Sequence, residues 1–185
     1  MSDMEIGELE ISPPIEKLIP VADPRYRTEA MGVLGPSDLK VFIPRRILQH
    51  IVDFSASDVA HEVGGFLIGN LYSHRGVQYI EIEGYIEAER AIQTAASMRF
   101  THDTFETRTR RMDREFPMAK VVGWHHTHPG YGVFLSSTDT YTHKTHFNLA
   151  WMVALVVDPK SHEMGFFQWK EGRLVDCGFY FIHNR

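Results

Sequence analysis

Three histidines stand close together in the segment 121–139, which reads VVGWHHTHPGYGVFLSSTD. The apolar run Val121–Trp124 predicts a buried strand that leads directly into His125, His126 and His128. Because successive side chains of a strand alternate between its faces, His126 and His128 share one face and His125 lies on the other. Two imidazoles on one face can bind a single zinc ion, at about 2.0–2.1 Å each.

A third ligand is available a short distance along the chain. Pro129 and Gly130 end the strand, and Ser136–Asp139 has the composition of a helix N-cap. This places Asp139 in the first helical turn, where its carboxylate is favoured by the helix dipole and can turn back toward the histidines. Three protein ligands leave the fourth position of a tetrahedral ion open for water, which is typical of catalytic rather than structural zinc sites.

The same helix offers alternative ligands. Asp139, His143 and His146 are spaced i, i+4 and i+7, so they share one helical face. Either histidine can therefore approach the zinc ion or help to bind a second one. An isolated His-x-His pair means little in a chain with 11 histidines. The full spacing is much rarer, and unpaired imidazoles between two apolar segments would be costly to bury.

The pattern of histidines, serine and aspartate in this segment resembles the motif of the JAMM (MPN-plus) zinc metalloproteases. This family includes the proteasome-lid deubiquitinase and the signalosome deneddylase. The family pattern is an upstream Glu, then His-x-His-Pro, then Ser-x-x-Asp, and it is filled by His126, His128, Pro129, Ser136 and Asp139. The upstream Glu usually precedes a Gly-rich apolar strand. The run His61–Gly69 matches that description and nominates Glu62. The resemblance extends from about Leu39 to the C-terminus.

The resemblance implies one zinc ion bound by His126, His128 and Asp139. The zinc-bound water, its pKa lowered toward 7, would attack the scissile carbonyl. Glu62 would act as general acid and base, and Ser136 would donate to the oxyanion. His143 and His146 are then left near the site or on the surface, and His125 packs against a neighbouring helix.

The implied substrate is the C-terminal tail of ubiquitin or a ubiquitin-like modifier, cut from a conjugate or a precursor. The segment 84–100 is expected to capture this tail as an added strand and to order when it binds. The short chain resembles stand-alone prokaryotic members, which act with E1-like and E2-like enzymes. Two alternatives stay open: a peptidase that processes sulfur-carrier proteins, and a non-catalytic MPN scaffold in a larger complex.

Composition limits the remaining possibilities. The single Cys177 fits a reducing compartment and excludes a deaminase-type zinc site, which needs paired cysteines. The net charge of −5, without a Lys/Arg stripe, argues against nucleic-acid binding. The longest apolar run, Leu149–Val157, is too short to span a bilayer, so no membrane association is expected. These features predict a soluble, cytoplasmic protein.

The chain divides into an arm and a domain. Residues 1–37 are acidic and contain five prolines, which predicts an arm that is either disordered or laid along the surface, where it can bind a partner or cover the cleft. Residues 38–185 form the JAMM/MPN domain. The Arg-rich face of the helix near Arg108–Arg114 is solvated surface or a contact for an acidic partner.

Periodicity predicts strands and helices that interleave with local hairpins, and therefore an α/β fold with a mixed sheet. The resemblance implies that this sheet is curved, mostly antiparallel and flanked by helices, in a cytidine-deaminase-like fold. Three helices are expected, at 47–57, 101–116 and 137–148. The strands are expected at 39–44, 63–72, 77–87, 98–100, 120–128, 150–157, 164–170 and 174–182. The segment 88–97 is expected to be a loop beside the site.

Overall fold

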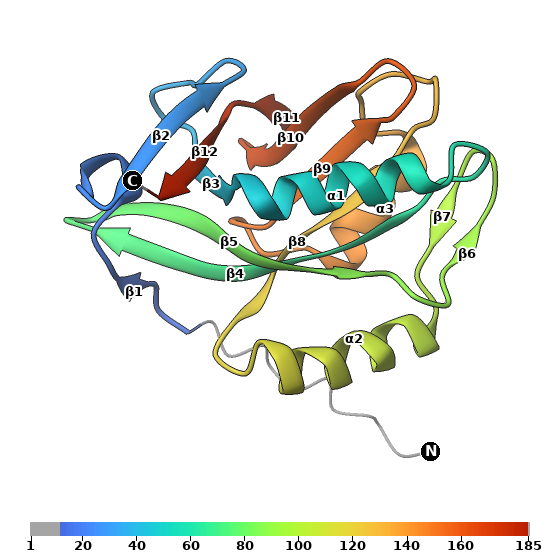
Figure 1. The fold of residues 1–185 in the computed structure, drawn as a ribbon, viewed down its shortest axis with the longest axis horizontal. Coiled ribbons are helices and arrows are strands. Elements are labelled where there is room, and N and C mark those ends of the chain that lie inside the picture. Colours follow the sequence, from blue (N-terminus) through green and yellow to red (C-terminus); the bar gives the residue numbers. More distant parts are fainter. Residues whose placement is uncertain (1–11, 185) are drawn as a thin grey trace.

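The computed structural model describes residues 12–184, and within this range the chain forms one large sheet with three α-helices (Figure 1). The sheet contains ten strands in the order β11-β10-β9-β8-β4-β5-β3-β12-β2, and β1 pairs with β4 beside this path. A separate two-stranded sheet is made of β6 (Ile92–Gln93) and β7 (Met98–Arg99). The expected mixed α/β fold is confirmed.

The centre of the sheet is the long hairpin of β4 (Gly64–His74) and β5 (Val77–Glu87) with its neighbour β8 (Lys120–Thr127). β8 runs antiparallel to β4 and parallel to β9 (Val153–Asp158). Consequently β8, which carries the histidines, is paired on both sides. Paired neighbours hold its backbone, and therefore its side chains, in one register.

The outer strands complete the sheet on both sides. Next to β9 lie β10 (Glu163–Lys170) and β11 (Arg173–Cys177). On the far side of β5 lie β3 (Lys40–Pro44), β12 (Phe179–Asn184) and β2 (Tyr26–Met31). The short β1 (Ile15–Glu16) runs parallel to the end of β4, and the 3-10 turn Pro20–Ala22 leads into β2.

Alternation along the strands produces a separate core on each face of the sheet. One core packs α1 (Arg45–Ser57) against one set of alternate strand residues, and its members include Leu67, Val122 and Leu155. The other core contains the intervening residues and receives α2 (His102–Glu115) and α3 (Ser137–His146), and its members include Phe66, Trp124 and Phe147. Figure 1 shows α1 across the sheet and α2 beyond the β4–β5 hairpin.

The helices α2 and α3 begin in the same way. Thr101 and Ser136 are their N-caps, and each accepts a hydrogen bond from the backbone N–H three residues later. The side chains of Thr104 and Asp139 accept in return from the N-cap backbone, which completes a capping box. The expected helix starts are confirmed, and Asp139 is held in the first turn of α3.

The glycines at the start of β4 allow neighbouring strands to approach closely. A Cβ on Gly64 would lie 2.2 Å from the carbonyl oxygen of His125, and one on Gly65 would lie 2.4 Å from that of Ile86. No side chain fits at such distances, because real Cβ atoms do not come this close to backbone oxygens. The Gly-Gly pair therefore brings the chain segment that carries Glu62 directly beside the histidine strand.

Some element boundaries differ from those predicted. The strand expected at 150–157 begins only at Val153. The strand expected at 174–182 is divided into β11 and β12 at Gly178, where a Cβ would lie 2.8 Å from the carbonyl oxygen of Met31. The expected loop at 88–97 contains β6, which pairs with the predicted short strand at Met98.

The arm predicted for residues 1–37 contributes more regular structure than expected. β1 and β2 both pair with the main sheet, and β2 forms six backbone register pairs with β12. These two strands lack the length and alternation that would reveal them in the sequence. The acidic start of the arm, residues 1–11, lies outside the described residues, and the division at residue 37 stays a prediction.

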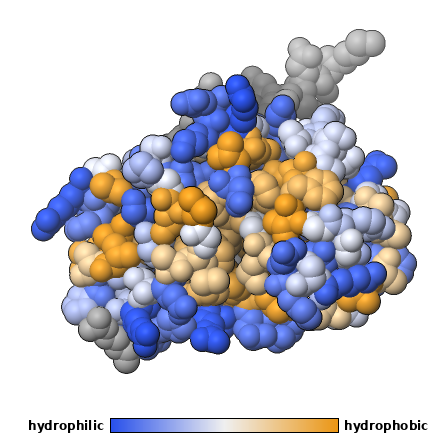
Figure 2. Space-filling view, turned by 90° about the horizontal axis from the view of Figure 1, so that it is seen from above, coloured by the Kyte–Doolittle hydropathy of each residue, from blue (hydrophilic) through white to orange (hydrophobic). Residues whose placement is uncertain are grey.

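The surface is mixed in character. Figure 2 shows hydrophobic side chains gathered across the middle of one face, with hydrophilic side chains around them. None of the helices among residues 12–184 combines the length and apolarity needed to cross a bilayer.

Candidate metal centre

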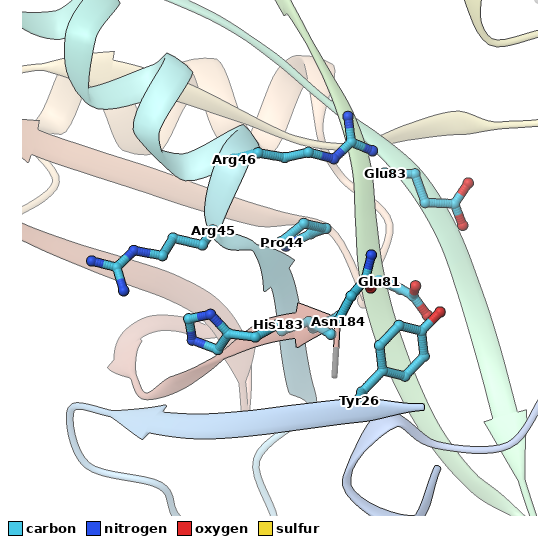
Figure 3. A pocket seen from close by; sticks show the side chains of 9 residues that line it. Tyr26, Pro44, Arg45, Arg46, Glu81, Glu83, His183 and Asn184 are labelled. Atoms are coloured by element: carbon cyan, nitrogen blue, oxygen red, sulfur yellow. The ribbon is translucent and has the colours of Figure 1, made fainter. Parts of the chain in front are cut away.

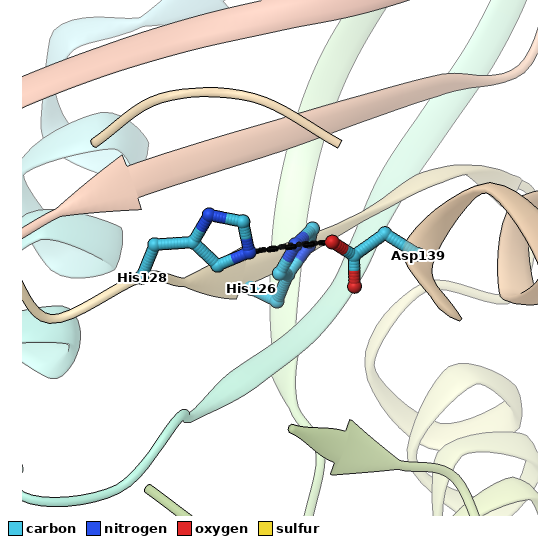
Figure 4. Close-up of side chains that lie close together, drawn as sticks. All are labelled: His126, His128 and Asp139. Carbon is cyan, nitrogen blue, oxygen red and sulfur yellow. Dashed lines mark hydrogen bonds and ion pairs between the residues drawn. The ribbon is translucent and has the colours of Figure 1, made fainter. Parts of the chain in front are cut away.

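Three side chains from two elements converge on one point. The Nε2 atoms of His126 and His128 lie 3.2 Å apart, and each lies 3.3 Å from Oδ2 of Asp139. All three residues are buried. Figure 4 shows the ring nitrogen of His128 and the carboxylate of Asp139 facing each other across His126. Among the residues that the structure describes, this group alone brings three or more such ligand atoms together.

The spacing of these atoms fits a zinc ion. In a tetrahedron with metal–ligand bonds of about 2.0–2.1 Å, neighbouring ligands are separated by about 3.3–3.4 Å. The three observed separations of 3.2–3.3 Å match one face of that tetrahedron. Two imidazole nitrogens and a carboxylate oxygen are also a donor set that zinc prefers. The residues present therefore fit the ion, and one coordination position would remain open.

Each histidine is held in place by a different neighbour. Nδ1 of His128 lies 3.2 Å from the carbonyl oxygen of Gly132, which can accept its proton. A proton on Nδ1 leaves the Nε2 lone pair free for a metal. His126 stacks on Trp124, with ring centroids 4.3 Å apart and planes 13° apart. Both rings therefore present Nε2 to the same point.

Asp139 is ionised by its surroundings. Burial opposes ionisation, but hydrogen bonding to His126 and His128 outweighs it and holds the pKa of the Asp139 carboxyl far below its usual value. Its Oδ2 also accepts a hydrogen bond of 2.7 Å from the backbone N–H of Ser136. The same carboxylate thus caps α3 and faces the two imidazoles.

Glu62 lies beside the three converging side chains and does not join them. Its Oε1 is 4.0 Å from Nε2 of His128, and the residue is only 4% exposed. Burial raises the pKa of Glu62 to about 7, while His128 lowers it and Asp139 raises it. A carboxyl with a pKa near neutrality can both accept and return a proton, as a general acid and base must.

The backbone on either side of Glu62 is anchored. Its N–H donates to the carbonyl oxygen of Thr94 at 2.8 Å. The next residue, Val63, exchanges hydrogen bonds of 2.9 Å with the backbone and hydroxyl of Thr127 on β8. The position of the Glu62 carboxylate is therefore coupled to the strand that carries the histidines.

Ser136 lies at the entrance to α3, next to the cluster. Its Oγ accepts a hydrogen bond of 3.1 Å from the backbone N–H of Asp139. Because the oxygen acts as acceptor in the cap, the hydroxyl proton stays free to donate to another group. The capping role and the expected role as oxyanion donor are therefore compatible.

The remaining histidines of the sequence analysis lie elsewhere. His125 is buried on the α1 face, between the hydroxyls of Ser55 and Tyr85 at 3.0 Å and 2.9 Å. His146 is exposed and packs beside Phe105. Neither belongs to the three-residue group.

His143 has a role that the sequence did not reveal. It is buried, and its Nδ1 accepts a hydrogen bond of 2.9 Å from Nε1 of Trp124. This bond joins α3, which carries Asp139, to β8, which carries His126. A helical face containing Asp139 and His143 was visible in the sequence, but the tryptophan partner on a distant strand was not.

Replacing His143 by Gln should weaken the loss of stability in acid. Burial lowers the pKa of His143 to about 4, with the backbone of Met152 opposing it and His126 adding to it. Because the unfolded value is near 6.5, the unfolded chain binds more protons between the two values, and stability falls as pH drops from 6.5 to 4, by up to about 3 kcal/mol.

Glutamine keeps an oxygen that can accept from Trp124 but does not titrate in this range. Thermal melts of both proteins at pH 7.5, 6.5, 5.5 and 4.5 measure the effect. Wild type should lose more stability than His143→Gln across this series, since His125 and His126 contribute equally in both. Parallel curves for the two proteins would contradict the assignment.

A cavity of about 510 Å³ lies away from these residues. It is surrounded by side chains at the starts of α1 and β2, in the middle of β5 and at the end of β12 (Figure 3). Its lining mixes cations such as Arg45 and Arg46 with the carboxylates of Glu81 and Glu83. None of the converging ligand atoms faces it, so it gives no support to metal chemistry.

The model of one protein family, described as JAB1/Mov34/MPN/PAD-1 ubiquitin protease, matches residues 36–149. That range is more than half of the chain and contains the whole cluster, from Glu62 to Asp139. The chain belongs to the JAB/MPN family. Membership of this family agrees with the resemblance seen in the sequence.

Several curated relatives are similar to this JAB/MPN domain. The ubiquitin carboxyl-terminal hydrolase RPN11 of Saccharomyces cerevisiae is 30% identical over 148 residues, which cover 78% of this chain and 47% of that protein. The NAD(+) hydrolase TcpA of a Theionarchaea archaeon is 30% identical over 66% of this chain and 33% of its own length. The chain thus spans about half, or less, of these relatives.

A solved structure shows the same fold. The solution structure of protein DSY2949 from Desulfitobacterium hafniense has a TM-score of 0.58 and covers 76% of this chain and 92% of its own. At 16% sequence identity, this similarity concerns the fold alone.

Proposed function

We propose that this JAB/MPN domain is a zinc-dependent isopeptidase or peptidase that cleaves after the C-terminal tail of ubiquitin or a ubiquitin-like modifier. The observation that carries the proposal is the triangle of His126, His128 and Asp139, whose edges match zinc coordination. Glu62 beside it and the family membership support hydrolysis rather than a structural role for the metal.

In this proposal, zinc when bound would supply a Lewis acid and lower the pKa of water toward 7. His126, His128 and Asp139 would hold the ion. The Glu62 carboxylate would take the proton of the attacking water and return it to the leaving amine. Its pKa of about 7 suits both transfers. The free hydroxyl proton of Ser136 would donate to the oxygen of the tetrahedral intermediate.

The small sheet of β6 and β7 supports a substrate that binds as an extended tail. Within the described residues, each of these strands pairs only with the other, so each has an outer edge for an added strand. The hairpin is joined to the site through the bond between Thr94 and Glu62. Relatives named as a ubiquitin hydrolase and as proteasome subunits support a ubiquitin-like tail. E1-like and E2-like enzymes as partners belong to the same proposal.

Metal analysis combined with hydrolysis of a ubiquitin-like C-terminal amide probe tests this function. We expect about one zinc per chain and hydrolysis that a chelator abolishes and added zinc restores. Comparing a Lys-linked conjugate with a linear sulfur-carrier fusion separates deconjugation from precursor processing. A folded chain that binds no zinc would instead fit a non-catalytic scaffold.

Replacing Ser136 by Ala should lower kcat by about 10²–10³-fold, the usual cost of losing one oxyanion donor. Thr101→Ala, which removes the equivalent N-cap of α2, is the matched control. Both variants lose a cap worth about 0.5–2 kcal/mol, but only Ser136→Ala should lose turnover. Equal kcat values for the two variants would leave Ser136 with a capping role alone.

A further inference from the structure

We infer that Asp158, a buried carboxylate at the end of β9, is a positioning residue that holds the loop after His128 and thereby keeps His128 ready to bind metal through Nε2. This inference rests on the proposed zinc site. It assigns a role to a residue that is not a ligand and lies 30 positions further along the chain from His128.

Asp158 makes an unusually complete set of contacts for a single carboxylate. It is 1% exposed, and four backbone N–H groups donate to it. Two come from the loop after His128, Gly130 at 2.8 Å and Gly132 at 2.9 Å. The other two come from its own turn, Lys160 at 2.9 Å and Ser161 at 3.3 Å. The carboxylate therefore joins two chain segments.

The loop needs such support because of its backbone conformation. Gly130 and Gly132 have φ values of +85° and +86°, in the left-handed region that favours glycine. Glycine loses more conformational entropy than any other residue when it is ordered. Both of these glycines donate their N–H groups to Asp158, so the carboxylate stabilises the two residues of the loop that are most costly to order.

The loop acts directly on a proposed ligand. The carbonyl oxygen of Gly132 lies 3.2 Å from Nδ1 of His128, while the N–H of the same glycine donates to Asp158. The backbone N–H of His128 also donates to Val157, the residue before Asp158, at 2.9 Å. The end of β9 thus holds His128 at its backbone and, through one peptide group, at its ring.

The charge of Asp158 agrees with this role. Burial opposes ionisation, but the N–H groups of Gly130 and Gly132 and of the following turn outweigh it and lower the pKa of Asp158 to about 2. A full negative charge strengthens each N–H bond that it accepts. It also polarises the Gly132 peptide, whose carbonyl then attracts the Nδ1 proton more strongly.

Asp158→Asn tests the inference, because an amide can accept on one side only and presents N–H groups to the backbone on the other. We expect zinc affinity, measured by chelator competition, to fall about 10–100-fold, the usual cost of losing a group that orients a ligand. Asp23→Asn is the matched control. Asp23 is a buried carboxylate bound to Arg25 just before β2, a strand separated from β8 by four others in the sheet, and its loss should leave zinc affinity unchanged.

A second measurement reports on His128 itself. In zinc-loaded wild type, the Nδ1 proton of His128 should exchange slowly with water, because it donates to the carbonyl oxygen of Gly132. Its signal is assigned in ¹H–¹⁵N spectra by comparison with His128→Gln, and in zinc-saturated Asp158→Asn it should exchange faster. A purely structural role for Asp158 would lower the melting temperature without changing this exchange rate.

The outcomes separate the two proposals. Wild type that fails to bind zinc would overturn the proposed function. Wild type that binds zinc, with Asp158→Asn binding within twofold of it, would overturn the role of Asp158 alone. If Asp158→Asn does not fold, wild type decides the matter, because a His128 Nδ1 proton that exchanges rapidly with water in the zinc-loaded protein would equally overturn it.

Discussion

Glu62→Gln should retain zinc and lose turnover. We expect stoichiometric metal binding, with kcat for a ubiquitin-like C-terminal amide probe lowered by about 10²–10⁴-fold, the range attributed to general acid–base catalysis. Glutamine has nearly the same shape as glutamate, but it cannot accept a proton at neutral pH. The Oε1 atom of Glu62 lies 4.0 Å from Nε2 of His128, so its substitution leaves the three converging ligand atoms in place.

The surroundings of Glu62 make the expected effect large. Burial raises its pKa to about 7, so the carboxylate is a stronger base than that of an exposed glutamate, whose pKa is about 4.3. The substitution also removes a buried carboxyl that has no salt bridge to a lysine or arginine among the described residues, so stability should not fall severely.

Glu81→Gln is the matched control for this substitution. Glu81 is another buried glutamate, on β5, and it is paired with Lys17 at 2.7 Å. Its change should affect stability and leave kcat unaltered. Full turnover by Glu62→Gln, or loss of zinc from it, would remove Glu62 from the proposed mechanism.

The sequence predicts the convergence of His126, His128 and Asp139 because its determinants are local. Alternation along a strand separates His125 from His126 and His128, and N-cap chemistry places Asp139 in the first turn of a helix. These rules depend on neighbours within a few residues. The structure accordingly brings these side chains together without any adjustment of the pattern.

Features that depend on distant partners could not be predicted in this way. The hydrogen bond between Trp124 and His143 joins a strand to a helix, and two of the four contacts of Asp158 join it to a remote loop. β1 and β2 are short strands that exist through pairing with β4 and β12. The break at Gly178 likewise reflects close contact with Met31. Such contacts leave no periodic signal in the sequence.

Asp139→Ala should lose both zinc and turnover, because it removes one of the three proposed ligands. Loss of a group that merely orients a ligand costs about 10–100-fold in metal affinity. Loss of the ligand itself should therefore cost more than 100-fold. With alanine in place of Asp139, the two imidazoles alone would leave two coordination positions open. The negative charge that offsets the ion would also be lost.

The substitution has a second effect that must be separated from the first. Oδ2 of Asp139 accepts the backbone N–H of Ser136, so alanine also removes half of the α3 capping box. Thr104→Ala removes the equivalent position of the α2 capping box and measures the cost of the cap alone. Asp139→Asn keeps an oxygen for the cap but removes the charge.

Zinc content by elemental analysis and melting temperature with and without zinc distinguish these effects. We expect zinc to raise the melting temperature of wild type and Thr104→Ala but not of Asp139→Ala, since a ligand stabilises only the folded state that binds it. For Asp139→Asn we expect a near-normal melting temperature without zinc. Because its zinc binding is weakened, the increase in melting temperature on adding zinc should lie between those of wild type and Asp139→Ala. Zinc stabilisation of Asp139→Ala equal to that of wild type would mean that the carboxylate serves the helix and that another group completes the site.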